Sequence, residues 1–454
     1  MNASTYAVDG ERLWRTLAEL AEIGATPAGG VARVALTDED RAGRDQFVAW
    51  ARELRCTVHV DQMGNLFARR DGSDPQRLPV VVGSHLDSQP TGGRYDGAYG
   101  VMVGLEVLRV LHDHDVRTAA PVEVVSWTNE EGARFPPAMI GSGVYAGAFS
   151  LVEGLAAPGI DGTTLGAELE RIGYAGEVPC GVPAGVSAGM SDGAPQGAPD
   201  GSGRRPIGCY IEPHIEQGPI LEAAGVALGT VTGVQGIRWY DVTINGQSAH
   251  AGSTPMEHRS DAMLAAARLV CEVDEIAARR APEGRATVGT LNVGPGSRNT
   301  VACSVTLTVD LRHPDADELS AMHEELLAAA QGPLFGPQSS GGPSNDEASG
   351  AGDLRGRSLP RPQITPIWYS PPIVFDPVVV EAVRAGAAAA GFEAMDITSG
   401  AGHDACYVSR VAPAGMLFIP CADGLSHNEA ESILPEHATA GAQATLHAVL
   451  ALAS

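Results

Sequence analysis

The chain has 454 residues, of which 44% are hydrophobic and 19% charged, as is typical of a globular rather than a disordered protein. Its 30 Lys and Arg residues stand against 55 Asp and Glu residues, a formal net charge of −25. We therefore expect no nucleic-acid partner, because phosphate binding needs a basic face. The sequence also has no run of about 18 apolar residues, so we expect no membrane span. The length predicts two or three domains.

Two further features predict a cytoplasmic location. The first residues, MNASTYAVDGERLWRTLAEL, lack the basic and then apolar regions of a signal peptide. The 7 cysteines are scattered and form no C-x-x-C pair. Such a pattern favours reduced, mostly buried thiols.

The first part of the chain predicts an α/β core. Apolar spacing indicates helices at 11–25, 39–55 and 100–114, two short strands within 56–68, and buried strands at 78–85 and 121–127. The order strand, loop, helix, strand in the second half of this region is typical of a βαβ unit with parallel strands.

A second region has a different pattern, with strands predicted at 237–245, 286–293 and 303–312 and helices at 259–280 and 315–330. Such an order is typical of an α+β domain of about a hundred residues, a size that can fold alone. We predict a catalytic domain at 1–219 and 334–454 and an inserted domain at 220–333. Two Gly/Pro/Ser-rich segments, 180–206 and 336–362, are predicted to be loops without chemistry.

The first candidate site is the run GSHLDSQPTGGRYDGAYG, which follows a buried strand. His85 and Asp87 come at the end of the strand, and Asp96 lies in a Gly-rich loop before a helix. Nitrogen and carboxylate ligands of this kind suit a divalent metal ion. The same residues can also be turn formers, helix caps or an ordinary core histidine.

The second candidate site is SWTNEEGARF, where Glu130 and Glu131 leave another buried strand side by side. Consecutive residues of an extended chain point in opposite directions. One carboxylate can therefore ligate a metal while the other acts as a general base. The alternative is an acidic turn exposed to solvent.

Two more segments carry single histidines near the ends of apolar runs. YIEPHIEQGPIL has His214 and Gln217, and DGLSHNEAE has His427. Each histidine alone is more often a hydrogen-bonded structural residue than a ligand. Together with His85, Asp96 and Glu131, they make the set that two divalent ions sharing one carboxylate would need.

The motif series resembles that of the hydantoinase/carbamoylase family of amidases. The segments that carry the resemblance run in order from about residue 60 to 435: GSHLDSQPTGGRYDG, TNEEGARF, HIEQGPILE, GQSAHAGSTP, SGAGHDA and DGLSHNEAE. The resemblance implies a mixed-sheet α/β domain holding a dinuclear metal site. It also implies that the inserted α+β domain serves as a lid and dimerises.

The resemblance also assigns roles to individual residues. It implies that His85 and His214 hold one ion, that Glu131 and His427 hold the other, and that Asp96 bridges them. Asp87 would orient His85, and Glu130 would be the general base. The remaining implied positions are His250, which would stabilise the tetrahedral intermediate across a homodimer, the substrate-binding Gln217, Asn299 and Arg312, and His403 in a site loop with no assigned step.

The implied reaction is hydrolysis of an N-carbamoyl-L-amino acid or N-carbamoyl-β-alanine to the amino acid, CO₂ and NH₃. An allantoate amidohydrolase is the first alternative and a dipeptidase or aminoacylase the next, since these share the wider fold. An inactive relative acting as a binding or scaffold protein is the alternative from outside the enzymes. Zinc is the first expectation for the two ions, and manganese, cobalt and nickel also suit such ligands.

Overall fold

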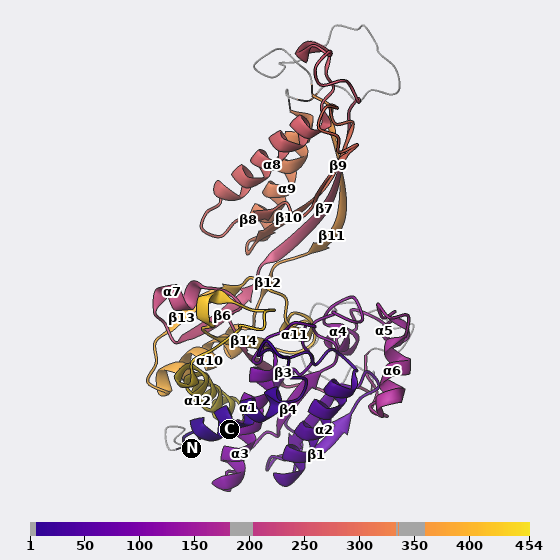
Figure 1. Ribbon diagram of the computed structural model, residues 1–454. Helices are drawn as coiled ribbons and strands as arrows, with labels where there is room; N and C mark the ends of the chain where they lie inside the picture. Colours follow the sequence, from indigo (N-terminus) through magenta and orange to yellow (C-terminus); the bar gives the residue numbers. More distant parts are fainter. Residues whose placement is uncertain (1–5, 182–202, 333–334, 336–358) are drawn as a thin grey trace. The chain divides into compact units, whose positions relative to one another are not determined.

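The computed structural model describes residues 6–181, 203–332, 335 and 359–454. The described chain divides into two compact units (Figure 1). The larger unit comprises residues 1–233 and 374–454, and the smaller unit comprises residues 234–373. Among the described helices, none is long and apolar enough to cross a membrane.

A nine-stranded mixed sheet forms the centre of the larger unit. Its strands are β1 (Thr57–Val60), β2 (Leu66–Arg70), β3 (Val80–His85), β4 (Val122–Trp127), β5 (Cys209–Ile215), β6 (Leu228–Val234), β12 (Ile373–Val374), β13 (Ala394–Ser399) and β14 (Ala414–Ile419). They lie in the order β1-β2-β4-β3-β5-β14-β6-β12, with β13 paired to β6. The central pairs β4-β3, β3-β5 and β5-β14 are parallel, and the flanking pairs β2-β4 and β14-β6 are antiparallel. The predicted α/β fold with a mixed sheet is therefore confirmed.

Helices cover this sheet and bury its central strands. They are α1 (Gly10–Ala21), α2 (Asp38–Glu53), α3 (Ala98–Asp113), α4 (Ile140–Tyr145), α5 (Leu151–Ala156), α6 (Leu165–Ile172), α7 (Ile220–Ala224), α10 (Pro377–Ala389), α11 (Asp404–Val408) and α12 (Pro435–Leu452). Helix α3 packs on β3, β4 and β5, and α12 packs on α3 and α10. Every residue of β3, β4 and β5 is buried. Their carboxyl ends, where β3 and β5 carry His85 and His214, follow the rule that parallel sheets present sites at this edge.

The smaller unit is a sheet with two helices on one face (Figure 1). The strands are β7 (Gly236–Asn245), β8 (Arg285–Thr287), β9 (Leu291–Gly294), β10 (Ser304–His313) and β11 (Pro362–Ser370), and the helices are α8 (Ala262–Ala278) and α9 (Ala316–Gln331). Alternate residues of β7 and β10 point inward and form a core with the helices, among them Tyr240, Val242, Val309 and Leu269. This alternation is the strand pattern that the sequence predicts.

The smaller unit starts and ends later in the chain than the sequence suggests. We expected boundaries near 220 and 335, but they fall at 233/234 and 373/374. Strand β6 pairs with β14 in the large sheet, so residues up to 233 belong there. Strand β11, which the sequence analysis missed, pairs with β7 over almost its whole length. Most of the two predicted loops, 180–206 and 336–362, lies outside the described residues.

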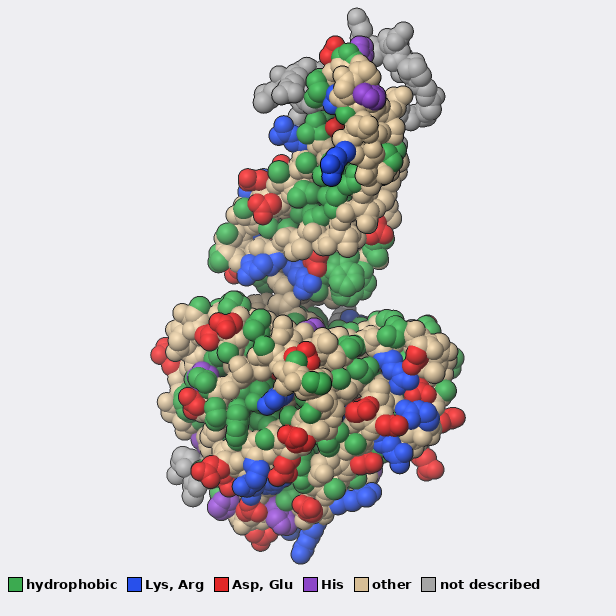
Figure 2. All heavy atoms as spheres, in the orientation of Figure 1, with side chains coloured by type: hydrophobic (Ala, Val, Ile, Leu, Met, Phe, Trp, Pro, Cys, Tyr) green, Lys and Arg blue, Asp and Glu red, His purple; other side chains and the backbone are tan. Residues whose placement is uncertain are grey.

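Two element predictions need correction in detail. The predicted strand 286–293 is two strands, β8 and β9, which both pair with β10. Thr287 lies opposite Asp310 and Leu291 lies opposite Leu307, so the segment between them is one residue longer than the facing segment of β10. This extra residue interrupts the pairing as a bulge. The predicted helix 259–280 begins at Ala262, since the Asp261 side chain caps it by accepting hydrogen bonds from Met263 and Leu264. Acidic and basic side chains are interspersed over the face of the larger unit seen in Figure 2.

Candidate metal centre

His85 is the last residue of β3 and is 2% exposed. Its Nδ1 lies 2.8 Å from the backbone carbonyl of Asp87, and its Nε2 lies 3.9 Å from Oδ1 of Asp96. Gly97, between the Asp96 loop and α3, has a φ of 64°. A Cβ at this position would come within 2.3 Å of the His85 ring. Only glycine permits this approach, so the Gly-rich loop is what brings Asp96 against His85.

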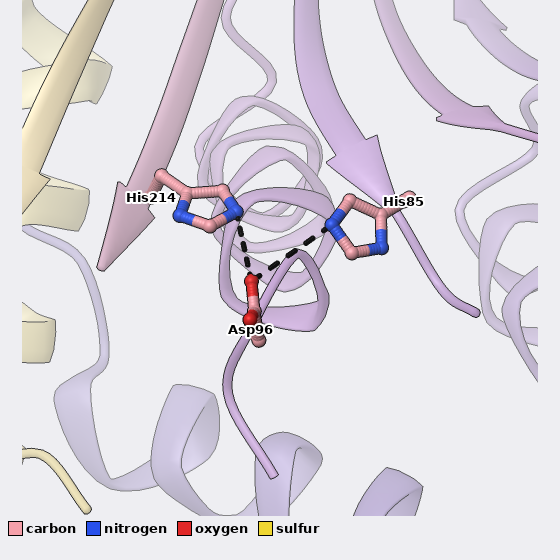
Figure 3. Close-up of side chains that lie close together, drawn as sticks. All are labelled: His85, Asp96 and His214. Carbon is pink, nitrogen blue, oxygen red and sulfur yellow. Dashed lines mark ion pairs between the residues drawn. The ribbon is translucent and has the colours of Figure 1, made fainter. Parts of the chain in front are cut away.

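Asp96 lies between three histidines. Nε2 of His214, on β5, is 3.2 Å from Asp96 Oδ1 (Figure 3). On the other side, Nε2 of His427 is 3.4 Å from Asp96 Oδ2 and 3.2 Å from Oε2 of Glu131. The structure thus brings together all five predicted ligands, and Asp96 contacts histidines through both of its oxygens.

These residues form two overlapping groups, His85–Asp96–His214 and Asp96–Glu131–His427, each with ligand atoms within 4.8 Å of one another. The hydrogen bonds of His214 test whether a cation suits the first group. Its Nδ1 faces the Ile215 carbonyl at 2.9 Å, so this nitrogen carries a proton whether or not the ring is charged. Its Nε2 is therefore the nitrogen that faces Asp96 Oδ1, at 3.2 Å, with the Gly97 nitrogen 3.1 Å away. An imidazole nitrogen and a carboxylate oxygen this close are stabilised by a proton or a cation between them, and both atoms are ligands of divalent metal ions, so the donor set fits a metal ion.

The charges of this cluster shift the pKa values of its members. Burial acts to raise the pKa of Asp96, but the neighbouring His214 and His85 hold it well below its usual range. Burial acts to lower the pKa of His214, but the hydrogen bond and charge of Asp96 outweigh it and raise the pKa to about 9. The hydrogen bond to Glu131 raises the pKa of His427 to about 9 as well. Without a metal ion, protons take the place of the cation.

Glu130 lies beside both groups without belonging to either. Its side chain is largely buried, and its Oε2 is 3.5 Å from Nε2 of His85. Burial raises the pKa of Glu130 well above its usual value, and the charges of Asp404, Glu131 and Asp87 add to the increase. A carboxyl group with a raised pKa beside candidate metal ligands has the properties of a general base.

Asp87 connects this site through both backbone and side chain. We expected it to orient His85, and the contact is made by its backbone carbonyl. Its carboxylate accepts the backbone N–H groups of Glu130 and Glu131, each at 3.2 Å. One buried residue therefore fixes the end of β3 and the turn after β4 together.

Gln217 lies in the same cluster, where its Nε2 donates to Asp96 Oδ2 at 2.9 Å. Its Oε1 is buried and has no hydrogen-bond partner among the described residues. The ring of His403 packs edge-on against His214 with ring centroids 4.5 Å apart, and its Nε2 is 3.0 Å from the Ser399 hydroxyl. His403 is fully buried, which lowers its pKa well below the usual value and keeps the ring neutral.

Sequence reasoning assigned no role to Glu431 and Ser426, although both lie in the quoted DGLSHNEAE motif. Oε1 of Glu431 accepts the N–H groups of Tyr95 and Asp96, at 2.9 and 3.1 Å. The Ser426 hydroxyl donates to Asp96 Oδ2 at 2.7 Å. These two residues hold the backbone and the side chain of Asp96. The motif was the available signal, since it places both within five residues of His427.

The other predicted residues lie in the smaller unit and fall into two places. His250 and Asn299 are both exposed. They are neighbours, because His250 forms an isolated β-bridge with Thr300 and the Asn299 carbonyl accepts the Ala251 N–H at 2.8 Å. Arg312 lies near the other end of β10 and binds Asp310, with Nη2 2.7 Å from Oδ2. Asp310 also accepts a hydrogen bond from the Trp239 indole at 3.0 Å.

Residues 81–451 match the peptidase family M20/M25/M40, and the chain belongs to this family. An N-carbamoyl-L-amino-acid amidohydrolase of Rhizobium meliloti is 42% identical, over 98% of this chain and 96% of the relative. The allantoate amidohydrolase of Bacillus subtilis is 30% identical, over 91% and 90% of the two chains. A crystal structure of an amidase of the hydantoinase/carbamoylase family from Burkholderia multivorans is 49% identical, with a TM-score of 0.86 and 99% of each chain covered.

The resemblance to the hydantoinase/carbamoylase amidases is thereby confirmed, and the protein is an enzyme of the amidohydrolase type. The M20 family is metal-dependent, and the described residues hold candidate His/Asp/Glu groups for such an ion.

Proposed function

We propose that this enzyme hydrolyses N-carbamoyl-L-amino acids. In this reaction R–NH–CO–NH₂ and water give R–NH₂, CO₂ and NH₃. The observation that supports it most is the pair of ligand groups sharing Asp96, with the buried Glu130 3.5 Å from His85. The 42% identity to an N-carbamoyl-L-amino-acid amidohydrolase over nearly the whole chain supports the substrate class.

In this proposal His85 and His214 would hold one divalent ion, Glu131 and His427 would hold the second, and Asp96, which belongs to both groups, would contribute to each. Bound ions of this kind polarise a carbonyl oxygen and lower the pKa of water from ~15.7 toward ~7. Zinc is the first choice for imidazole and carboxylate ligands, and manganese, cobalt and nickel also suit them.

Glu130 is the general base. Its carboxylate takes a proton from the attacking water and returns it to the leaving amine, which a group with a raised pKa does well near neutral pH. The hydrogen bond from the Glu130 backbone N–H to the Asp87 carboxylate fixes its position. Because Glu130 is buried, its charge is felt strongly by the reacting atoms.

The remaining predicted residues supply the substrate contacts in this proposal. His250 stabilises the developing oxyanion, and Asn299 of the smaller unit and Gln217 of the larger unit bind the substrate. Arg312 binds the substrate carboxylate, a task that suits the planar fork of a guanidinium group. Asp310 already holds one edge of this fork.

The positions of His250 and Arg312 within the smaller unit favour a homodimer. Ser304, the first residue of β10, and Arg312, the last but one, are roughly 27 Å apart at about 3.4 Å per residue. His250 and Asn299 lie beyond the Ser304 end. An amino-acid derivative is far too short to touch both ends. We infer that one substrate meets Arg312 of one subunit and His250 of the other.

Allantoate is the second candidate substrate, because the Bacillus subtilis enzyme that shares 30% identity acts on it by name. Allantoate and N-carbamoyl amino acids share a ureido group and a carboxylate. The same metal groups and the same Arg312 therefore suit both.

The test is ammonia release from N-carbamoyl-L-α-amino acids, N-carbamoyl-β-alanine and allantoate after stripping the protein and reloading it with zinc, manganese or cobalt. We expect metal-dependent turnover of the α-amino-acid derivatives, and Glu130→Gln should lower it by about 10²–10⁴-fold while keeping the metal. Turnover of allantoate alone would replace N-carbamoyl amino acids by allantoate as the proposed substrate. Full activity of Glu130→Gln would refute the role of Glu130 as the general base.

A further inference from the structure

We propose that Arg33, which lies in no helix or strand, is a positioning residue for the metal centre. Its guanidinium binds the backbone carbonyl of Leu86, the residue between His85 and Asp87, and places a buried positive charge beside this segment. This inference rests on the metal site of the proposed function and adds a residue that none of the predicted motifs contains. Arg33 is 2% exposed, so its charge is compensated within the protein.

The guanidinium of Arg33 donates to three backbone carbonyls. Nε binds the carbonyl of Leu86 at 2.7 Å, and Nη1 binds those of Ile23 at 2.9 Å and Leu20 at 3.1 Å. Leu20 and Ile23 lie at the C-terminal end of α1, where a cation is favourable. Arg33 therefore ties a helix end to the residue that follows His85.

The backbone of Arg33 binds the same loop. Its N–H donates to the Ser88 hydroxyl at 2.8 Å, and its carbonyl accepts the Ser88 N–H at 2.9 Å. Residues 86 and 88 are thus both held by Arg33, and Asp87 lies between them. Asp87 in turn contacts His85 through its carbonyl and Glu130 and Glu131 through its carboxylate.

The charge of Arg33, like these hydrogen bonds, helps to hold Asp87 in place. Burial lowers the pKa of Arg33 to about 10, and the negative charges of Asp40 and Asp87 oppose that decrease. The guanidinium is therefore positive at neutral pH and attracts the Asp87 carboxylate. A fixed Asp87 keeps the metal-ligand candidates His85 and Glu131 in one geometry before an ion arrives.

The sequence makes room for this side chain at Gly43 in α2. A Cβ at Gly43 would come within 2.8 Å of Cδ of Arg33. Glycine costs helix stability relative to alanine, so its presence inside a helix needs a packing reason. The buried stem of Arg33 is that reason.

The test measures metal binding directly. Arg33→Lys keeps the charge, but one ammonium group cannot span the carbonyls of Leu20, Ile23 and Leu86. We expect zinc affinity, measured by chelator competition on the stripped protein, to fall by roughly 10–100-fold, as is typical for loss of an outer partner of a metal ligand. The visible absorption spectrum of the cobalt-loaded protein should change, because the position of His85 changes.

Arg44→Lys is the matched control. Arg44 is as buried as Arg33 but lies within α2, where it pairs with Asp40 at 2.9 Å and donates to the Gly64 carbonyl and the Thr128 hydroxyl. None of its hydrogen bonds within the described chain reaches residues 85–88. We expect it to lower thermal stability and to keep the zinc affinity within about threefold. Gly43→Ala is a second, independent variant that should displace Arg33 without removing it and weaken zinc binding in the same direction.

Wild-type affinity and an unchanged cobalt spectrum in Arg33→Lys would overturn the role of Arg33. An equal loss in Arg44→Lys would also overturn it, because the effect would then be general loosening of the unit. Failure of the wild-type protein to bind any of these metals is a different result, which refutes the metal centre itself and this inference with it.

Discussion

The two units hold most of their candidate residues in different environments. In the larger unit, His85, Asp96, Glu130 and His214 are between 0 and 7% exposed, and His427 is the exception, with a side chain that is 50% exposed. In the smaller unit His250 and Asn299 are exposed, and the Arg312 side chain is 29% exposed. Under the proposed function, the first set would hold small ions and the second would meet a larger molecule.

Under the proposed function, this difference would divide the work of catalysis between fixed and adaptable groups. Buried donors cost no reorganisation when charge develops, because the fold has already oriented them. Exposed donors gain strength only when a ligand or a partner surface excludes water from them. Arg312 is intermediate, since Asp310 orients its guanidinium without burying it. The predictions below test whether each set behaves as its environment requires.

The largest effect should come from Asp96→Ala in the larger unit. Asp96 belongs to both ligand groups, so its loss should weaken both ions. We expect a decrease in affinity of more than about 100-fold per ion, beyond the loss caused by outer partners, and activity below detection. Metal analysis after dialysis and circular dichroism measure binding and fold. Retention of two tightly bound ions would show that Asp96 is not shared.

The next effect concerns His250 in the smaller unit. His250→Ala removes one donor to the oxyanion and should lower kcat by about 10²–10³-fold. Because the side chain is exposed and lies outside the metal groups, the metal content should not change. Steady-state kinetics and metal analysis on the same sample separate the two effects.

Mixing two inactive variants sharpens this result. In a homodimer that shares His250 across subunits, the pair His250→Ala and Glu130→Gln contains one complete site. After unfolding and refolding together, a mixture should recover about a quarter of wild-type activity, since half of the dimers are mixed and each has one good site. If His250 acts within its own subunit, no activity returns.

Arg312→Lys should have a smaller effect, concentrated in KM. Losing the bidentate fork for a carboxylate costs roughly 1.5–3 kcal/mol, or about 10–100-fold, when the lysine binds only as a point charge. The KM for a matched substrate without a carboxylate, an N-carbamoyl alkylamine, should change little on this substitution. Equal losses for both substrates would mean that Arg312 does not bind the carboxylate.

The same contrast explains which parts of the candidate site could be predicted from the sequence. His85, at the end of a buried strand, and Glu130, just after another, stand out because continuous apolar runs and the residues that follow them are local patterns. The five ligand candidates were therefore found from the sequence, and the structure brings them together around Asp96.

What the sequence did not reveal depends on contacts between distant segments. Strand β11 was missed because its partner β7 lies more than a hundred residues earlier and most of its side chains are exposed, so no apolar pattern marks it. Glu431 was missed because its partners, the Tyr95 and Asp96 amides, are backbone groups far along the chain. Arg33 has no local signal, since its acceptors are carbonyls.

The smallest predicted effect is a dependence of thermal stability on pH in the metal-free protein. The pKa values of His214 and His427 are about 9 in the folded protein, against about 6.5 for an unperturbed histidine. Protons on these rings therefore stabilise the fold fully below about pH 6.5, and this stabilisation is lost as the pH rises through 9. Metal ions compete with the same protons, so their stabilisation increases over that interval.

We expect the melting temperature of the metal-free protein to fall by about a few degrees between pH 7 and 9, and the gap to the zinc-loaded protein to widen. Calorimetry with and without a chelator measures both curves. His427→Ala should flatten the metal-free curve, because one of the two raised pKa values is removed. Parallel curves of melting temperature against pH for the metal-free and zinc-loaded proteins would show that protons and zinc do not bind the same nitrogens. That result would refute the assignment of both the buried His214 and the exposed His427 as ligands.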